Sequence, residues 1–158
     1  MPQALPPKPV SASRISLAQL SQLENANNLG NVHGGWIMKL ADEAGALACM
    51  RHAQRPVVTV AIDSMVFRKP IKIGDLVIIS AEVTYVGHTS LEAEVTVLTE
   101  NPMTGERSET NTAYLVYVAL GDDGRPVPVP PLIGETEDEK RKLEEGRQRQ
   151  ARRLAAKR

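Results

Sequence analysis

Most of the chain after Pro56 consists of segments that favour β-strands and are joined by short turns. Four segments are rich in β-branched residues or alternate apolar and polar side chains. They cover residues 57–67, 75–87, 90–98 and 112–120. Turn-forming residues stand between them, as in the Asn-Pro and Thr-Gly pairs of residues 101–105. Parallel neighbours need long crossover connections, so strands joined in this way pair antiparallel. The sequence therefore predicts an antiparallel meander.

One helix is expected before these strands. Between Trp36 and about Arg51 the apolar residues recur at helical spacing, at Ile37, Leu40, Ala41, Ala44 and Ala48. The middle of this segment is small-sided, with four alanines and Gly45 between positions 41 and 48, so neighbouring backbone can approach it closely. We therefore predict an α+β fold in which the antiparallel meander wraps a central helix. A strand at 14–23 and a loop at 24–35 are expected to precede the helix.

The two ends of the chain have a different character. Residues 1–12 are rich in proline and are expected to form a flexible arm, which leaves one domain over residues 13–124. Residues 125–158 read as a Pro-rich linker and a charged helix. That helix is acidic where it begins and basic where it ends, and Thr136 with Glu139 predicts a capping box. Two interpretations stay open for its Arg-rich end: exposure to solvent, or contact with a phosphate-bearing ligand or a neighbouring subunit.

Composition narrows the class of protein. The chain has 158 residues, enough for one domain with a substantial core, and its 19 basic and 19 acidic residues balance, so nothing points to nucleic acid. Its one cysteine, Cys49, lies in an apolar segment and predicts a small buried side chain in a reducing compartment. The N-terminus lacks a signal-peptide pattern, and no apolar run approaches the roughly 20 residues that span a bilayer. We therefore expect a cytoplasmic protein with no membrane span.

Asp42 is the one polar residue on a line of small or apolar side chains. At helical spacing that line also holds Met38, Gly45, Ala46 and Cys49. A carboxylate in this position is partly desolvated, which raises its pKa unless a partner offsets the effect. Such a group suits a general base near neutral pH, whereas the alternative is a carboxylate that only bonds nearby backbone. Its neighbour Glu43 stands four residues after Lys39, a spacing typical of an ion pair in water.

The residues that enter the helix favour the catalytic interpretation. Gly34 and Gly35 let a substrate approach main-chain N–H groups closely, at a helix N-terminus that favours negative charge. An oxyanion formed from a carbonyl would be stabilised there. Nearby amides at Asn27, Asn28 and Asn31 can orient water. This combination suits the hydrolysis of an activated acyl group.

The chain resembles the hotdog-fold acyl-CoA thioesterases over roughly residues 13–150, above all the cytosolic, brain-type acyl-CoA hydrolase branch. The resemblance rests on ENANNLGNVHGGWIMKLADEAGALACMRHA, VVTVAIDSMVFRKPIKIGD, SAEVTYVGHTSLEAEVTVLTENPMTGE and PVPVPPLIGETEDEKRKLEEGRQRQ. In particular, the pattern NxxGxxHGG is followed by an acid seven residues after the last of its glycines, Gly35. The resemblance implies a long helix wrapped by an antiparallel sheet, which agrees with the pattern of the residues.

Residue by residue, the resemblance places the active-site asparagine on Asn27 and the catalytic acid on Asp42. Asn31 stands where some bacterial relatives have aspartate, which leaves Asp42 as the only acid. Animal members hold two hotdog repeats in one chain, whereas this chain holds one and is similar to the single-repeat bacterial form. The resemblance therefore implies a homodimer in which Asn27 of one subunit faces Asp42 of the other, and a homohexamer built as a trimer of such dimers.

Other residues are candidates for contacts with substrate. His33 could position Asn27 or the substrate, or be an ordinary loop histidine. Arg68 and Lys69 suit the phosphates of coenzyme A, or are solvated loop charges. Thr89 and Ser90 could line the pantetheine channel, although a plain turn is the alternative. No metal is expected, because Cys49 and His52 have no further ligands nearby, and nothing implies a cofactor.

The sequence thus predicts an acyl-CoA thioesterase with Asp42 as general base or nucleophile, and the thioester carbonyl directed at the N–H groups near Gly34 and Gly35. A non-catalytic acyl-CoA-binding or interaction module of the same fold is the alternative. A hotdog dehydratase would need a histidine in the body of the helix, where none precedes His52. An acyl-CoA sensor would need an output module, and only the charged tail is present.

Overall fold

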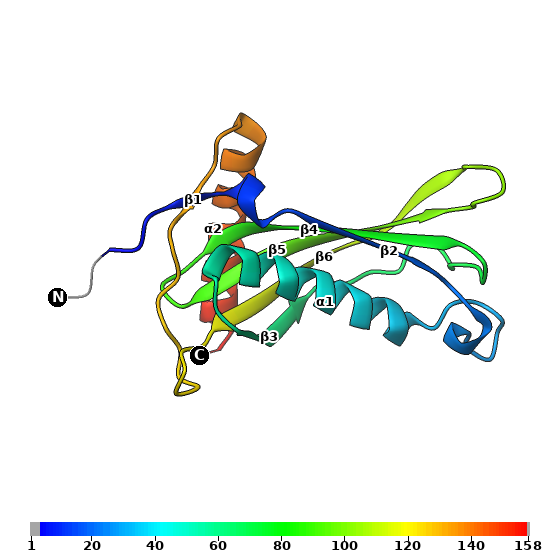
Figure 1. Cartoon of the computed structure of the whole chain (residues 1–158), viewed down its shortest axis with the longest axis horizontal. Helices are drawn as coiled ribbons and strands as arrows, with labels where there is room; N and C mark the ends of the chain where they lie inside the picture. Colours follow the sequence, from blue (N-terminus) through cyan, green and yellow to red (C-terminus); the bar gives the residue numbers. More distant parts are fainter. Residues whose placement is uncertain (1–3, 158) are drawn as a thin grey trace.

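The structure, a computed structural model, describes residues 4–157 of the chain. Its elements follow the order β1 (Lys8–Pro9), η1 (Val10–Ser13), β2 (Ile15–Leu20), η2 (Leu23–Asn25), α1 (Gly34–Ala53), β3 (Val57–Asp63), β4 (Leu76–Val86), β5 (Ser90–Glu100), β6 (Arg107–Ala119), β7 (Leu132–Ile133) and α2 (Glu137–Ala156). One five-stranded sheet has the order β2-β4-β5-β6-β3, with all neighbours antiparallel. It curves along α1, as Figure 1 shows. The predicted α+β fold with a sheet wrapped around a central helix is confirmed.

The core lies between α1 and the concave face of the sheet. Ala41, Ala44 and Ala48 of α1 have no exposed surface, and they pack in one cluster with the inward side chains of β4 and β5. On β5 the predicted alternation is confirmed for its apolar face, since Leu91, Ala93, Val95 and Val97 are all buried. Cys49 is a buried free thiol, as expected. Small side chains on α1 let the sheet come close along the whole helix.

Several element boundaries differ from those predicted. α1 begins two residues earlier and ends two residues later than expected, with Gln54 in the left-handed conformation as its C-cap. β6 begins at Arg107 rather than at 112. β3 ends at Asp63 rather than at 67, because Ser64 has a φ of 54°, which turns the chain out of the strand. The apolar residues after Ser64 therefore belong to a loop.

Residues 8–13 differ most from the arm without regular structure that the prolines suggested, whereas residues 1–3 of that predicted arm lie outside the described residues. Lys8–Pro9 pairs in parallel with Leu132–Ile133. The Lys8 ammonium donates to the last carbonyls of α1, those of Arg51 (2.7 Å) and His52 (2.8 Å). His52 is buried and donates through Nε2 to the Pro130 carbonyl at 2.7 Å. These contacts bind both terminal segments to the C-terminal end of α1. The division of the chain at residues 12 and 124 stays a prediction.

α2 packs against the convex face of the sheet, opposite α1. It begins after Thr136, whose hydroxyl accepts from the Glu139 N–H at 3.1 Å, so the predicted cap is present. Gly146 allows the close approach, since a Cβ there would lie 2.7 Å from the Cβ of Tyr85. The helix thus lies on the sheet although it has few apolar residues.

Buried charge holds the C-terminal half of α2. Glu92 of β5 is only 1% exposed. It accepts two hydrogen bonds from Arg149 (3.0 and 2.7 Å) and one from Arg153 (2.6 Å). The sequence left solvent, a phosphate-bearing ligand and a neighbouring subunit open as surroundings of the Arg-rich end. In the structure, two of its arginines, Arg149 and Arg153, bind a carboxylate of the same chain. Burial opposes ionisation of Glu92, but the hydrogen bonds from Arg149, Thr84 and Arg153 outweigh it, so the pKa of Glu92 lies below its ordinary value.

We predict that Arg149→Met lowers the free energy of unfolding by about 2–3 kcal/mol. Removal of one partner leaves a buried charge poorly compensated, and Arg153 and Thr84 soften the loss. The melting temperature should fall by about 5–10 °C in thermal unfolding followed by circular dichroism. Arg147→Met is the matched control: Arg147 bonds only Glu144 on the exposed side of α2, so its melting temperature should match that of the wild type.

The ion pair of Glu92 with Arg149 also predicts how the stability of the fold depends on pH. A carboxyl group whose folded-state pKa is lowered stabilises the fold above its unfolded-state pKa of about 4.5, and this stabilisation is lost as pH falls through the folded-state pKa. When pH falls from 7 to about 3, the melting temperature of Arg149→Met should therefore decrease by less than that of the wild type. Parallel loss in the two proteins would contradict this account of Glu92.

Candidate active site

The loop before α1 is organised around the side chain of Asn27. Its Oδ1 accepts from the backbone N–H groups of Leu29 (2.9 Å) and Asn31 (3.2 Å). The Asn27 N–H in turn donates to the Asn31 carbonyl at 2.8 Å, and Gly30 closes the turn with a φ of 81°. These bonds use the oxygen of the Asn27 amide and leave its NH₂ group as the part available to a substrate or a water molecule.

His33 forms the N-cap of α1. Its Nδ1 accepts from the Gly35 N–H at 2.9 Å, so the proton of a neutral ring is on Nε2. The Gly35 N–H is therefore already engaged within the chain. Among the described residues, no acceptor is bonded to the Gly34 N–H. Of the two glycine donors expected to face an oxyanion, Gly34 is the open one.

A cavity of about 330 Å³ opens beside the start of α1. It brings together five of the residues predicted from sequence, namely Asn27, Asn31, Gly34, Arg68 and Lys69. Apolar side chains complete the lining, among them Phe67, whose ring would lie 3.4 Å from a Cβ on Gly34. Sequence analysis missed Phe67 because a strand was expected through residue 67. The cavity thus joins amide, backbone N–H and basic groups at one end of the helix.

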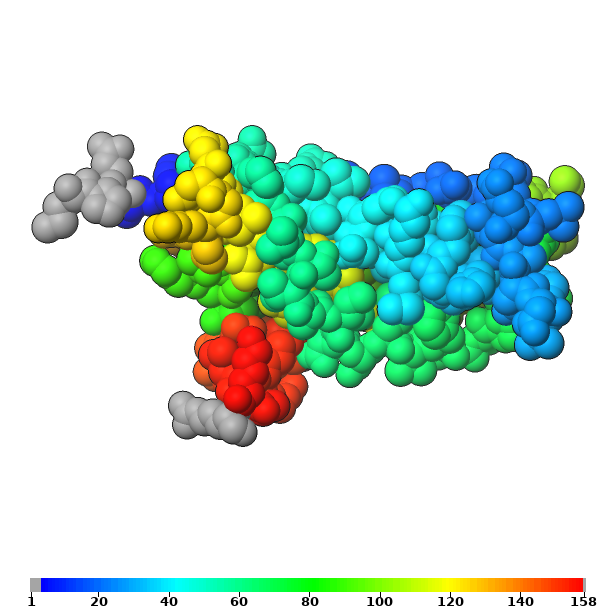
Figure 2. All heavy atoms as spheres, turned by 90° about the horizontal axis from the view of Figure 1, so that it is seen from below, coloured from blue at the N-terminus to red at the C-terminus, as the bar shows by residue number. Residues whose placement is uncertain are grey.

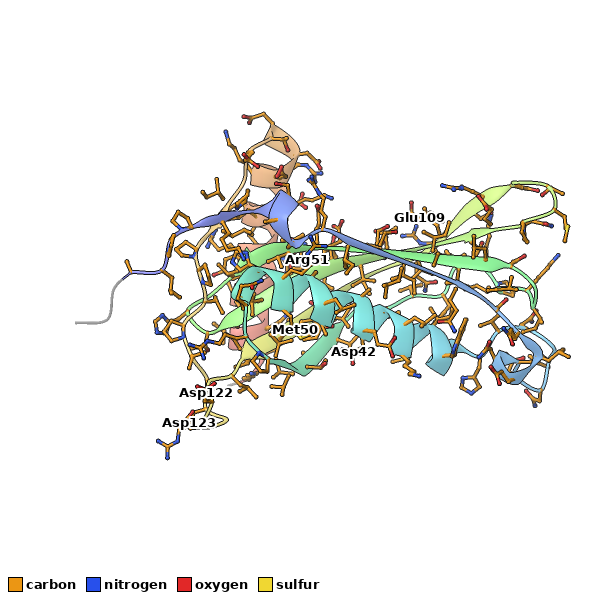
Figure 3. The ribbon with its side chains drawn as sticks, in the orientation of Figure 1. Asp42, Met50, Arg51, Glu109, Asp122 and Asp123 are labelled. Atoms are coloured by element: carbon orange, nitrogen blue, oxygen red, sulfur yellow. The ribbon has the colours of Figure 1, made fainter. Side chains whose placement is uncertain are left out.

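Asp42 lies further along α1, near its middle (Figure 3). Its carboxylate is half-buried, and Oδ1 accepts from the hydroxyls of Thr59 (2.7 Å) and Tyr117 (3.0 Å). Burial of its hydroxyl and the nearby charge of Asp42 raise the pKa of Tyr117, so this tyrosine is a proton donor at all ordinary pH values. Sequence analysis missed both partners. Thr59 was visible as a hydroxyl within the apolar strand VVTVAID, whereas nothing local to Tyr117 indicates its contact with Asp42.

One chain does not bring all the predicted residues together. Eight residues of helix separate Gly34 from Asp42, about 12 Å at 1.5 Å per residue. Thr89 and Ser90 stand where β5 begins, paired through their carbonyls with Ala119 and Gly87, at the end of the sheet where α1 finishes. His33 and Gly35 are exposed at the N-terminus of α1. Asp42 and the Asn27 loop are therefore two separate parts of a site.

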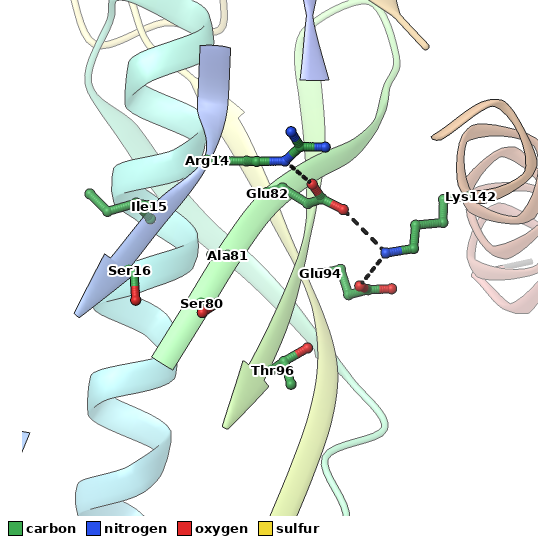
Figure 4. A pocket seen from close by; sticks show the side chains of 9 residues that line it. All are labelled: Arg14, Ile15, Ser16, Ser80, Ala81, Glu82, Glu94, Thr96 and Lys142. Carbon is green, nitrogen blue, oxygen red and sulfur yellow. Dashed lines mark hydrogen bonds and ion pairs between the residues drawn. The ribbon is translucent and has the colours of Figure 1, made fainter. Parts of the chain in front are cut away.

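A pocket of about 510 Å³, larger than the cavity beside α1, lies elsewhere, on the convex face of the sheet next to α2. Figure 4 shows its charged groups bound to one another: Lys142 contacts Glu82 (3.2 Å) and Glu94 (3.0 Å), and Arg14 contacts Glu82 (2.8 Å). These charges are already paired, and none belongs to the residues around Asp42. The candidate site is therefore the one along α1 and not this pocket.

Two further properties concern residues 4–157. Within this range no three or more His, Cys, Asp or Glu side chains are grouped so that they could hold a metal ion. None of the helices in that part of the chain is both long enough and apolar enough to cross a membrane.

Known proteins are similar to this chain in sequence and in fold. Residues 29–106 match the Thioesterase superfamily. The cytosolic acyl coenzyme A thioester hydrolase of Rattus norvegicus is 37% identical over 147 residues, which cover 90% of this chain and 38% of the rat protein. The chain thus spans well under half the length of that relative.

Solved structures give closer matches in length. An acyl-CoA hydrolase from Staphylococcus aureus, in complex with butyryl coenzyme A, coenzyme A and coenzyme A disulfide, has a TM-score of 0.89 and 34% identity over 96% of this chain and 93% of that one. A hexameric acyl-CoA thioesterase has a TM-score of 0.91 and 37% identity, over 96% and 97% of the two chains. Variants of the S. aureus enzyme with alanine in place of an aspartate, an asparagine or a threonine have also been solved.

Proposed function

Because the chain belongs to the thioesterase superfamily and has the hotdog fold, we propose that it hydrolyses fatty acyl-CoA to a free fatty acid and coenzyme A. The observation that carries the proposal is Asp42, a half-buried carboxylate on the central helix whose Oδ1 is held by two hydroxyls. A carboxylate fixed in this way is already oriented toward one reaction partner, so little conformational entropy is lost when that partner binds. The comparison with an S. aureus hydrolase that binds coenzyme A supports the substrate class.

The other groups take complementary roles in this proposal. The Gly34 N–H, at the positive end of α1, stabilises the oxyanion that forms from the thioester carbonyl. The Asn27 NH₂ group holds the attacking water or the carbonyl. Arg68 and Lys69, on the wall of the same cavity, bind phosphates of coenzyme A, for which guanidinium and ammonium groups are suited.

Asp42 can act by either of two routes. As a general base it takes a proton from water, which attacks the thioester carbon; the C–S bond then breaks, and coenzyme A leaves as the thiol with that proton. As a nucleophile it forms a mixed anhydride and releases coenzyme A, and water then cleaves the anhydride. In a single turnover in heavy-oxygen water, label in the Asp42 carboxylate would favour the anhydride, since the general-base route labels only the fatty acid.

A homodimer brings the two parts of the site together in this proposal. β3 is the last strand of the sheet, so one of its edges is open in the described chain. It exposes Val58 (43%), Val60 (53%) and Ile62 (39%), and it carries Thr59, the partner of Asp42. Figure 2 shows α1 and the segment after it side by side on one face of the molecule. Pairing of β3 with its copy would cover this apolar edge and place Asn27 of one subunit near Asp42 of the other.

The hexameric state of similar thioesterases supports a trimer of such dimers. Cytoplasmic location stays a prediction from the sequence. A non-catalytic acyl-CoA-binding module is the alternative function, and one assay separates the two. With long-chain acyl-CoA and a thiol reagent, a thioesterase releases free coenzyme A continuously, whereas a binding module gives no release beyond the background.

We predict that Asp42→Asn lowers kcat by about 10²–10⁴-fold, the range expected for loss of a positioned base. Folding should be preserved, because the amide oxygen can still accept from Thr59 and Tyr117. Glu43→Gln is the matched control, since Glu43 is exposed and contacts only Lys39 at 3.9 Å. Thiol release and thermal unfolding measure both effects, and equal kinetic losses in the two variants would contradict the role of Asp42.

The shared site predicts complementation between inactive subunits. Asn27→Ala and Asp42→Asn chains, unfolded and reassembled together, should recover about a quarter of wild-type activity. With random pairing about half the dimers are mixed, and two-fold symmetry gives each mixed dimer one site with both native residues. A site built within one subunit predicts no recovery from dimers that mass spectrometry shows to be mixed.

A further inference from the structure

Tyr117 makes a contact with α1 that the proposed reaction does not by itself require. Its ring rises from β6 in the core and is fully buried, and its hydroxyl reaches the backbone and the side chain of Asp42 together. The hydroxyl lies 2.9 Å from the Asp42 carbonyl oxygen and 3.0 Å from Asp42 Oδ1. The single hydroxyl proton is shared between these two acceptors, so one side chain ties the Asp42 carboxylate to the backbone of the helix.

Gly45 is what allows this contact. A Cβ on Gly45 would lie 2.5 Å from the Tyr117 hydroxyl oxygen and 3.2 Å from two ring carbons. Because Tyr117 has no exposed surface, its ring has no solvent-filled space into which it could move. A glycine in the middle of a helix costs about 1 kcal/mol relative to alanine. The absence of a side chain at Gly45 leaves space for the Tyr117 hydroxyl, which accounts for a glycine three residues after Asp42.

The two oxygens of the Asp42 carboxylate are consequently unlike. Oδ1 accepts from Thr59 on the edge strand and from Tyr117 in the core. Within residues 4–157 no donor is bonded to Oδ2. Two donors from two different strands fix the plane of the carboxylate as well as its direction, which a single hydrogen bond would not do.

We propose that Tyr117, admitted by Gly45, is a positioning residue that acts with Thr59 to hold Oδ1 and so makes Oδ2 the reacting oxygen of Asp42. The proposal rests on the proposed acyl-CoA hydrolysis for its kinetic consequences only. Oδ2 then takes the proton from water or attacks the thioester carbon, while Oδ1 keeps its two donors throughout. The Tyr117 hydroxyl stays protonated and contacts no substrate.

The first test is Tyr117→Phe, which removes the hydroxyl and leaves the ring in the core. kcat should fall by about 10- to 100-fold, the size expected when a hydrogen bond to a charged group is lost. KM should stay within about twofold, because no binding group has changed. Tyr114→Phe is the matched control: Tyr114 lies three residues away on the same strand, but its hydroxyl bonds Glu94 at 3.1 Å and its ring contacts Arg149 of α2.

The second test is Gly45→Ala, which keeps the tyrosine but displaces its hydroxyl. It should reproduce the loss of kcat with little change in KM. Crystal structures of the wild type and the variants supply a readout that is independent of activity. In Tyr117→Phe and Gly45→Ala the Asp42 carboxylate should rotate away from the orientation that it keeps in the wild type and in Tyr114→Phe.

The outcomes separate the two proposals. An unrotated Asp42 carboxylate in Tyr117→Phe, or a kinetic loss equal to that of Tyr114→Phe, overturns the positioning role even if the wild type hydrolyses acyl-CoA. A rotated carboxylate in a protein whose wild type releases no coenzyme A overturns acyl-CoA hydrolysis and supports the positioning role.

Discussion

The close approach of α1 to the sheet is the constraint on which the rest of the structure depends. Ala41, Ala44 and Ala48 have no exposed surface, and larger side chains at these positions would push the sheet away. Because the sheet lies so near, a tyrosine that rises from β6 reaches the backbone of α1 at Asp42. The small residues of the helix therefore serve both the packing of the core and the geometry of the candidate site.

The central helix and the meander were predictable because their signals are local. Helical spacing of small residues and alternation along the strands both survive in the structure, and α1 differs from its predicted range by only two residues at each end. Asp42 was also predicted as a candidate from its helical angle, and its role stays a prediction. Its partners were not, since Thr59 and Tyr117 lie 17 and 75 residues away in sequence and only the folded sheet brings them to one oxygen.

Two differences from the expectations of local composition share one physical cause. Prolines near the N-terminus and charges in the tail were judged by local composition, which favours exposure to solvent. Tertiary contacts override it: Lys8 satisfies the terminal carbonyls of α1, and Glu92 is buried with Arg149 and Arg153 as its partners. β5 shows the limit of the alternation rule, because its outward face at Glu92 is covered by α2 and not by water. No pattern within either segment specifies such a partner.

The spacing of the candidate groups along α1 bears on how two chains would meet. The open Gly34 N–H and Asp42 lie about 12 Å apart on one helix, too far to act on one thioester. In the proposed dimer, a two-fold axis that passes beside α1 at the level of Met38 would bring Gly34 of one helix opposite Asp42 of the other. Met38 is 38% exposed and lies on the same line of the helix as Asp42. An exposed apolar side chain at this position suits a contact between the two helices of the proposed dimer, whereas a charge beside the axis would face its own copy.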